Sequence, residues 1–275
     1  MPYSVHKGVR TYYEVYGEGP PLLLMHATPW DHTMWLYQIA HFSTWFRVIA
    51  PDSRCFGRSD MVRTPFAFDD IVDDTLALCE KENVTDALMM GVSLGSRLGF
   101  CLAHHRPDMF KAVVLVGGNA QASQTADTPS DRRRADRIRR YREEPIEIAY
   151  DWQLRGTLKD DWPATPLGKY VVRMMMEKTP RLDGYAMSNI FESSSKKNLE
   201  PLLPDIRIPV LIVTGEFDRS VAEAAATARM IPGGRHAIVP GTGHCCCVED
   251  PVAFDTLVID WFTSLGMMPK IATRA

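Results

Sequence analysis

The sequence predicts an α/β fold in which helices flank a mostly parallel central sheet and a helical cap is inserted into the chain. Two observations lead to this prediction. Short apolar runs rich in β-branched residues alternate with longer amphipathic stretches, which is typical of βα units around a parallel sheet. The alternation stops near residue 120 and resumes near residue 209. A chain of 275 residues is long enough for one large α/β domain with such an insertion.

The expected strands and helices follow from these runs. Apolar and β-branched runs predict strands at 9–16, 22–25, 47–50, 87–90, 111–116, 209–213 and 236–239. Amphipathic stretches predict helices at 33–41, 69–82, 93–105, 221–230 and 251–265. In the second of these helices, Ile71, Leu76 and Cys79 are spaced to share one face.

The segment without strands divides the chain into two expected parts. Residues 1–120 and 204–275 are expected to form the core domain, and residues 121–203 a helical cap. The cap segment contains apolar side chains that must cover something, among them Trp152 and Met175. A cap over the strand ends would use such side chains to line a substrate pocket.

The cap segment also contains a strongly basic stretch. Seven arginines stand between Arg132 and Arg142. Acidic residues at positions 131, 136, 143 and 144 accompany them. Because opposite charges at helical spacing pair with one another in water, we expect a solvated helical face here rather than an anion-binding surface.

Composition excludes several classes of partner and cofactor. The 31 lysines and arginines are balanced by 34 acidic residues, so a net charge of −3 gives no basic field for nucleic acid or an anionic membrane. No apolar run is long enough to span a membrane, and the first residues lack the apolar segment of a signal peptide, so a cytoplasmic protein is expected. The six cysteines include no C-x-x-C pair, and neither a disulfide framework nor a zinc site is expected.

A nucleophile-turn pattern follows the expected strand at 87–90, in the run Gly91-Val92-Ser93-Leu94-Gly95. A strand that turns sharply into a helix strains its central residue and brings the residues two before and two after it together. Both of those positions therefore need small residues, and both are glycine. The hydroxyl of Ser93 would stand over the end of the sheet as the candidate nucleophile.

Two later segments supply the base and the acid that a serine nucleophile needs. His244 ends a glycine-rich loop after the last expected strand. Asp218 lies just beyond the strand at 209–213, with Glu216 as the alternative acid. The chain order of the candidate triad is Ser93, Asp218, His244.

These features resemble the α/β-hydrolase superfamily over nearly the whole chain. Within it, the sequence is most similar to capped esterases and enol-lactonases of the 3-oxoadipate enol-lactonase type. The run MHATP at 25–29 resembles the H-G-x-P oxyanion loop, and PDSRCFGRSD at 51–60 resembles D-x-R-G-x-G-x-S-D. The closing pattern G-H-x-x-x-x-E-x-P-x-x-F is matched by His244, Glu249, Pro251 and Phe254.

The resemblance implies an oxyanion hole made of two backbone N–H groups. One belongs to Leu94, directly after the nucleophile, and the other to Ala27 or Thr28, with Ala27 preferred. Trp30 would stand beside the hole as a pocket wall. His26 is expected to be a buried, hydrogen-bonded residue that shapes the loop.

The predicted activity is that of a carboxylic ester hydrolase or lactonase working through a Ser-His-Asp triad and an acyl-enzyme. The expected partner is a small to medium, largely apolar small-molecule ester or lactone, and no metal or organic cofactor is expected. C–C hydrolases, perhydrolases and hydroxynitrile lyases resemble the same scaffold and share the triad, so these activities stay open. A ligand receptor with slow turnover also stays open.

Overall fold

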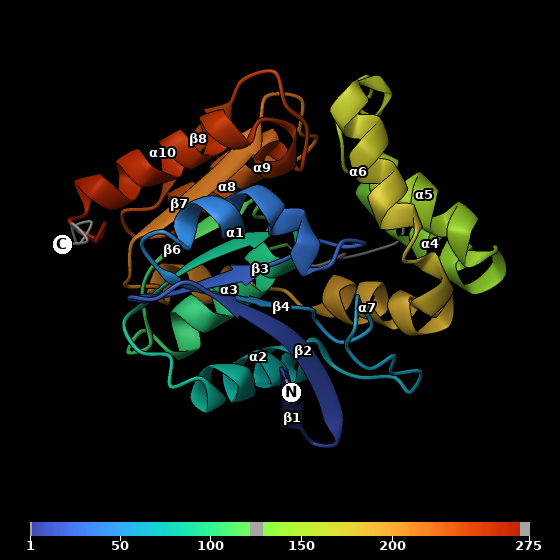
Figure 1. Cartoon of the computed structure of the whole chain (residues 1–275), viewed down its shortest axis with the longest axis horizontal. Helices are drawn as coiled ribbons and strands as arrows, with labels where there is room; N and C mark the ends of the chain where they lie inside the picture. Colours follow the sequence, from blue (N-terminus) through green and yellow to red (C-terminus); the bar gives the residue numbers. More distant parts are fainter. Residues whose placement is uncertain (1, 122–128, 270–275) are drawn as a thin grey trace.

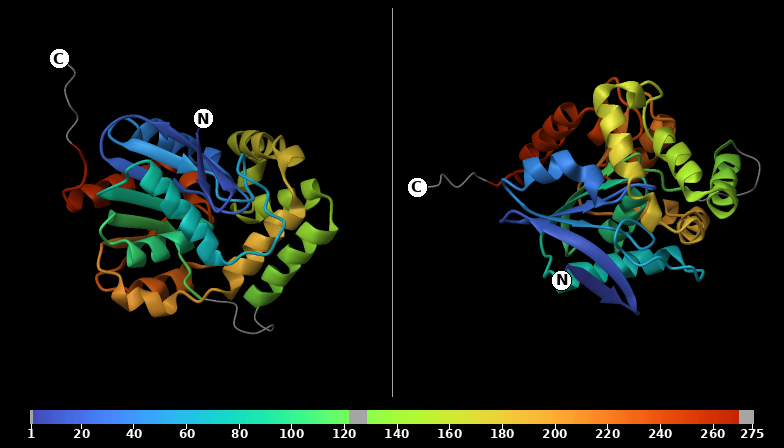
Figure 2. Two further views of the ribbon diagram at one scale, coloured as in Figure 1. Left: turned by 90° about the horizontal axis from the view of Figure 1, so that it is seen from below. Right: turned by 45° about the vertical axis from the view of Figure 1, so that its right-hand side comes forward.

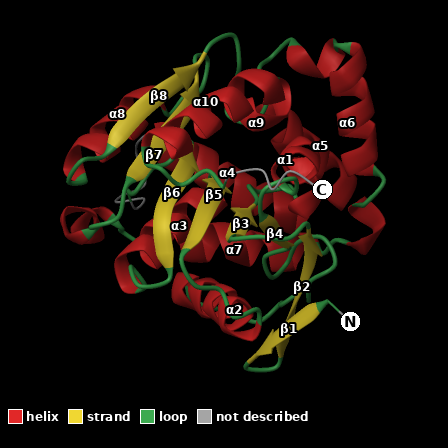
Figure 3. Ribbon diagram, turned by 60° about the vertical axis from the view of Figure 1, so that its left-hand side comes forward, coloured by secondary structure: helices red, strands yellow, loops and turns green. Residues whose placement is uncertain are grey.

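The computed structural model describes residues 2–121 and 129–269, and Figure 1 shows a central sheet with helices on both sides. Among the described residues the sheet has eight strands in the order β1-β2-β4-β3-β5-β6-β7-β8, which Figure 3 shows across the sheet. The strands are β1 (Tyr3–His6), β2 (Val9–Tyr16), β3 (Pro21–Met25), β4 (Arg47–Pro51), β5 (Ala87–Val92), β6 (Phe110–Val116), β7 (Val210–Gly215) and β8 (Arg235–Val239).

Strand direction confirms the predicted α/β fold. From β4 to β8 all neighbouring strands are parallel, whereas β2 pairs antiparallel with both β1 and β4. Every residue of β5 and β7 is buried, as expected for parallel strands covered on both faces. The sequence prediction lacks β1, because its four residues include one buried side chain and give no apolar run.

Helices cover both faces of the sheet. The core helices are α1 (Leu36–Phe42), α2 (Phe68–Lys81), α3 (Leu94–His105), α8 (Val221–Met230), α9 (Cys246–Glu249) and α10 (Pro251–Ser264). Helices α1 and α10 contact each other on one face, while α2 and α3 lie together on the other (Figure 1). The carboxyl ends of the parallel strands stay free of these helices, and loops that follow the strands gather there.

The chain between β6 and β7 is helical, and no strand occurs in its described part. It contains α4 (Pro129–Glu143), α5 (Ile146–Gly156), α6 (Pro166–Met176) and α7 (Gly184–Lys196), with short 3-10 turns η2 (Trp162–Ala164), η3 (Thr179–Arg181) and η4 (Glu200–Asp205). Figure 2 shows these helices as a group beside the sheet. Helix α4 packs on both α5 and α7.

Polar contacts fasten this helical insertion to the loops that follow the strands. Lys178 Nζ lies 2.7 Å from both carboxylate oxygens of Asp31, which is buried. Trp30 Nε1 donates a hydrogen bond of 3.1 Å to Thr157 Oγ1. Because Trp30 and Asp31 follow β3 directly, both contacts hold the insertion over the carboxyl end of that strand.

No helix in the described ranges is long and apolar enough to cross a membrane.

Replacing Lys178 should destabilise the protein, because it leaves the buried carboxylate of Asp31 without its cation. We expect Lys178→Met to lower the free energy of unfolding by about 3 kcal/mol in urea titrations. The exposed pair of Lys196 with Glu192, 2.9 Å apart, supplies the control. Lys196→Met should cost less than about 0.5 kcal/mol. Equal losses in the two variants would contradict the role given to Lys178.

Candidate active site

Ser93 occupies a strained turn between β5 and α3. Its φ of 53° and ψ of −100° lie in a region that L-residues rarely adopt. Its backbone N–H donates a hydrogen bond of 2.8 Å to Val116 O on the neighbouring strand β6. The strand end therefore holds Ser93 in place.

The lack of space around the turn explains why glycine stands two residues before and two residues after Ser93. A Cβ on Gly91 would lie 2.5 Å from the backbone carbonyl carbon of Gly95. A Cβ on Gly95 would meet the backbone oxygen of Met25 at the end of β3. Such contacts are far closer than real Cβ contacts, so any larger residue would open the turn.

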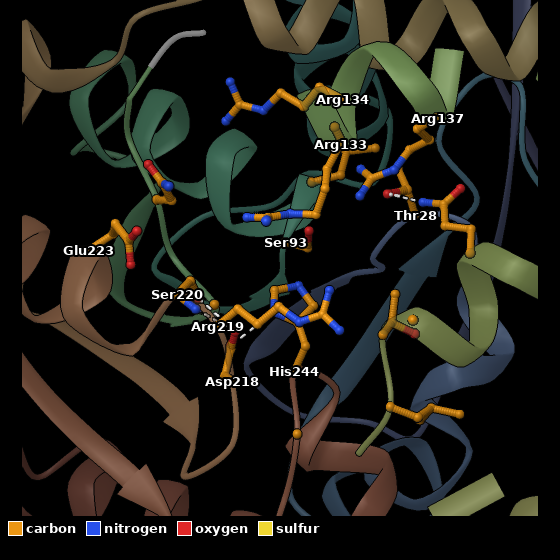
Figure 4. A pocket seen from close by; sticks show the side chains of 18 of the residues that line it. Thr28, Ser93, Arg133, Arg134, Arg137, Asp218, Arg219, Ser220, Glu223 and His244 are labelled. Carbon is orange, nitrogen blue, oxygen red and sulfur yellow. Dashed lines mark hydrogen bonds and ion pairs between the residues drawn. The ribbon is translucent and has the colours of Figure 1, made fainter. Parts of the chain in front are cut away.

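His244 and Asp218 meet beside this turn. His244 Nδ1 lies 2.8 Å from Asp218 Oδ2, and Figure 4 shows the imidazole ring between that carboxylate and Ser93. Asp218 Oδ1 accepts two hydrogen bonds of 2.9 Å, from the backbone N–H and from the hydroxyl of Ser220. A carboxylate that only accepts fixes the imidazole tautomer with the proton on Nδ1, which leaves the Nε2 lone pair as the basic atom.

The pair also shifts both pKa values. Burial alone would raise the pKa of Asp218, but the charge of His244 and the hydrogen bonds from His244 and Ser220 lower it to about 2. Burial likewise works against the protonated His244, yet the Asp218 carboxylate outweighs it and raises the pKa of His244 above its ordinary value of 6.5. The imidazole is therefore a stronger base than a free one.

Glu216, the alternative acid, is placed elsewhere. Its side chain is exposed, and Glu216 Oε2 accepts a hydrogen bond of 2.9 Å from the backbone N–H of Gly241. The structure brings Asp218, and not Glu216, to His244.

Three further residues fix the loop that carries His244. Glu249 Oε2 accepts hydrogen bonds from the backbone N–H of Gly243 at 2.9 Å and of Lys159 at 3.2 Å, which joins this loop to the insertion. Gly117, with φ of 62°, leaves room for the imidazole, because a Cβ there would contact His244 Cε1. Sequence reasoning missed Gly117; the signal was the glycine pair directly after the strand at 111–116.

The structure places the two candidates for the second oxyanion donor, Ala27 and Thr28, in different surroundings. The N–H of Ala27 points to Met34 Sδ at 3.2 Å, and Ala27 is fully buried outside the cavity lining. Thr28 and Leu94 both line the cavity beside Ser93. Ala27 is therefore replaced by Thr28, the alternative, as the second candidate donor.

His26 shapes this loop as expected. Its Nδ1 lies 2.8 Å from Ala27 O, and its Nε2 accepts a hydrogen bond of 2.9 Å from the backbone N–H of Ser53. One partner only accepts and the other only donates, which assigns the proton to Nδ1 of a neutral ring. Burial also lowers the pKa of His26, so it stays neutral.

A cavity of about 620 Å³ opens over Ser93. The core contributes to its lining Thr28, Ser93, Leu94, Gly117, Asp218 and His244, and the insertion contributes Arg133, Arg134, Arg137, Gln153, Thr157 and Lys159. The insertion therefore covers the carboxyl ends of the strands, where Ser93, Asp218 and His244 meet.

None of the three pocket residues expected from the sequence lines this cavity. Trp30 is fully buried behind it, with its indole N–H used by Thr157. Met175 is fully buried in the insertion. Trp152 lies on the outer surface of α5, where the Arg140 guanidinium stacks 4.6 Å from its ring centre. Apolar type alone could not tell packing positions from pocket positions.

The basic stretch has two different faces, so its prediction as a solvated face is half wrong. Arg139 and Arg140 pair with Asp136 at 2.7 and 2.9 Å on the outer side of α4. Arg133, Arg134 and Arg137 instead line the cavity. These three arginines also correct the expectation that apolar side chains of the cap segment line the pocket.

One group of side chains in the described ranges has metal-ligand atoms close together, namely Asp31, His32 and Asp52. Protein donors already occupy these atoms. Asp31 binds Lys178, and Asp52 Oδ1 accepts from the backbone N–H of His32 at 2.8 Å and contacts His32 Nδ1 at 2.7 Å. We assign this group to structural support of the loop after β3.

Comparison with known proteins identifies the family of this chain. A model described as the alpha/beta hydrolase family matches residues 22–256. The 3-oxoadipate enol-lactonase 2 of Acinetobacter baylyi is 26% identical over 257 residues, with 90% of each chain covered. The 2-(acetamidomethylene)succinate hydrolase of Mesorhizobium japonicum is 27% identical over 237 residues, covering 83% of this chain and 82% of the relative. The crystal structure of the enol-lactonase from Burkholderia xenovorans has a TM-score of 0.86 at 25% identity, covering 95% of this chain and all of that chain.

Removing the charge of Asp218 should lower the pKa of His244. In the protein as it stands, that pKa lies above 6.5 because the carboxylate outweighs burial. In Asp218→Asn the burial remains and the carboxylate is gone, so we expect a pKa below 6.5. NMR titration of the imidazole Cε1–H signals measures it, with His244→Gln to identify the signal. Glu216→Gln is the control and should leave the pKa of His244 unchanged. The same pKa in the wild-type, Asp218→Asn and Glu216→Gln proteins would contradict the assignment of Asp218 as the partner of His244.

Proposed function

Because the chain belongs to the alpha/beta hydrolase family, we propose that it cleaves a carboxylic ester or lactone with Ser93 as nucleophile. His244 acts as general base and Asp218 as its partner. The observation that carries this proposal is the hydrogen bond of 2.8 Å between His244 and Asp218, in the cavity onto which Ser93 opens. That bond directs the free Nε2 of the imidazole to the serine proton.

The reaction begins with attack of Ser93 Oγ on the substrate carbonyl carbon. His244 Nε2 takes the hydroxyl proton as the new C–O bond forms, and Asp218 stabilises the imidazolium that results. The carbonyl π electrons move to oxygen, and the tetrahedral oxyanion forms between the N–H groups of Leu94 and Thr28. His244 then returns the proton to the leaving alkoxide as the old C–O bond breaks.

Water completes the cycle. It replaces the leaving group in the cavity, gives a proton to His244 and attacks the acyl-enzyme. Collapse of the second tetrahedral species releases the acid and restores Ser93. In a lactone the leaving alkoxide stays attached to the acyl chain, so one ring-opened product leaves at the end.

The insertion at 121–203 is the cap of this enzyme in our proposal. It closes one side of a cavity of about 620 Å³, which suits a small-molecule substrate. Two of the compared proteins are named as enol-lactonases, and this supports a lactone or ester as the bond that is cleaved.

Loss of the Ser93 hydroxyl should abolish the reaction. We expect Ser93→Ala to lower kcat by about 10⁴-fold or more on p-nitrophenyl esters of two to eight acyl carbons and on the lactone dihydrocoumarin. Ser264→Ala, at the exposed end of α10, is the control and should behave as the wild-type protein. Wild-type and Ser93→Ala proteins that are equally active, or equally inactive, on all these substrates would refute the proposal. A single stoichiometric burst without further turnover would identify a receptor instead.

The pH dependence should follow the base. Because His244 must be neutral to accept the proton, kcat/KM should rise with pH around a midpoint above 6.5. In Asp218→Asn that midpoint should move below 6.5, and the plateau should fall by about 10⁴-fold, since the tautomer is no longer fixed. Initial rates between pH 5 and 9 measure both effects; a midpoint that does not move on this substitution would exclude His244 as the titrating group.

A further inference from the structure

One wall of the cavity is made of arginines. Helix α4 presents Arg133, Arg134 and Arg137 to the cavity, and Figure 4 shows their side chains around the space above Ser93. Arg137 lies four residues after Arg133 and three residues after Arg134, and at this spacing the side chains share one side of the helix. Nothing in the mechanism above uses them.

These arginines lack the partners that their neighbours have. On the outer side of α4, Arg139 and Arg140 form ion pairs with carboxylates of the same helix. Within the described residues, no carboxylate lies within ion-pair distance of the three inner guanidinium groups. The Nε of Arg137 is buried without a hydrogen-bond partner, and its guanidinium carbon lies 5.1 Å from the centre of the Phe191 ring.

Crowding of like charges is visible in the pKa values. Burial, together with the charges of Arg134 and Arg133, lowers the pKa of Arg137 to about 10. Burial also lowers the pKa of Arg134; the charge of Asp131 on the same helix opposes this effect, and the charge of Arg133 adds to it. An arginine guanidinium group stays positively charged at neutral pH. Three cations held together in a partly buried wall cost free energy unless an anion joins them.

Four other described residues of the lining carry a carboxylate, namely Asp160, Asp161, Asp218 and Glu223, and none of them forms an ion pair with these arginines. Asp218 is engaged by His244 at 2.8 Å, and Asp161 is engaged by Lys159 at 2.9 Å. Glu223 belongs to α8 and lies across the cavity from Arg137 (Figure 4). Arg97, another cation of the lining, already donates to four backbone carbonyl groups and is a structural residue. Arg219 lines the cavity from the core side, and the α4 wall holds the largest group of cations in the described lining that form no ion pair.

We propose that the substrate carries a carboxylate, which the guanidinium groups of Arg133, Arg134 and Arg137 bind while Ser93 attacks the ester or lactone bond. This inference rests on the proposed function. A guanidinium group presents paired N–H donors that match the two oxygens of a carboxylate. The bound carboxylate is a spectator: hydrolysis adds water across the C–O bond, and the acid released from Ser93 brings a second negative charge to the product.

A matched pair of esters tests the inference. Mono-p-nitrophenyl adipate and p-nitrophenyl hexanoate differ in a terminal carboxylate against a methyl group. We expect kcat/KM for the adipate ester to exceed that for the hexanoate ester by about tenfold or more, after subtraction of uncatalysed hydrolysis. Equal values, or a preference for hexanoate, would overturn the inference while leaving the proposed function intact.

Arginine variants locate the binding site. Arg137→Gln should lower kcat/KM for the adipate ester by about 10- to 100-fold and change the hexanoate value by less than about twofold. Arg133→Gln, at an exposed position that the fold does not need, should act in the same direction, and Arg137→Lys should retain part of the preference. Arg139→Gln, on the outer side of the same helix, is the matched control and should change neither value. Loss of activity on both esters in every α4 variant, the control included, would overturn the assignment.

Binding without turnover separates this inference from the proposed function. Ser93→Ala protein is titrated calorimetrically with adipate, hexanoate and inorganic phosphate. Adipate should bind more tightly than hexanoate, should lose affinity in the added Arg137→Gln background and should be displaced by salt. If adipate binds in this way but wild-type protein cleaves no ester, the proposed function fails and the carboxylate site stands. Phosphate binding more tightly than adipate would overturn the carboxylate assignment.

Discussion

The close approach of three backbone segments at the end of β5 is the constraint on which the site depends. Ser93 can turn back over the sheet because Gly91 and Gly95 have no side chains. Backbone atoms of Gly95 and the carbonyl oxygen of Met25 occupy the space that such side chains would need. The same turn begins α3, so Leu94 lines the cavity directly after Ser93, and β3 leads into the segment with Thr28. The candidate nucleophile and the candidate oxyanion donors are thus positioned by the same close approach of backbone segments.

Charge is handled in opposite ways on the two sides of Ser93. On one side, the Asp218 carboxylate is held by hydrogen bonds with His244 and Ser220. On the other side, Arg133, Arg134 and Arg137 gather without an ion pair to a described carboxylate. A folded chain tolerates such an imbalance where a ligand removes it, which is why strongly shifted groups gather in functional sites. The side with Asp218 and His244 fits the proposed proton transfer, and the side with the three arginines fits the proposed binding of an anionic group.

Local patterns in the sequence were sufficient for every described strand except β1, for the interruption of the sheet and for the turn at Ser93, because each depends on neighbours along the chain. Asp218 and His244 could be named because each follows a strand, and parallel strands end at the same edge of a sheet. The cavity wall could not be predicted in this way. Whether Arg137 faces solvent or the cavity depends on how α4 packs against α7. Likewise, the hydrogen bond from the N–H of Ala27 to Met34 Sδ is a contact that only tertiary packing creates.

The origin of the two sets of side chains has a consequence for how this enzyme can diversify. Ser93, Asp218 and His244 come from loops of the sheet, whereas the cationic wall comes from a single helix of 15 residues. Under the functions proposed above, reactivity and selectivity are encoded in separate stretches of the gene. A short exchange of codons within α4 can redirect the enzyme to uncharged or even cationic molecules, while the bond-breaking apparatus is inherited without change.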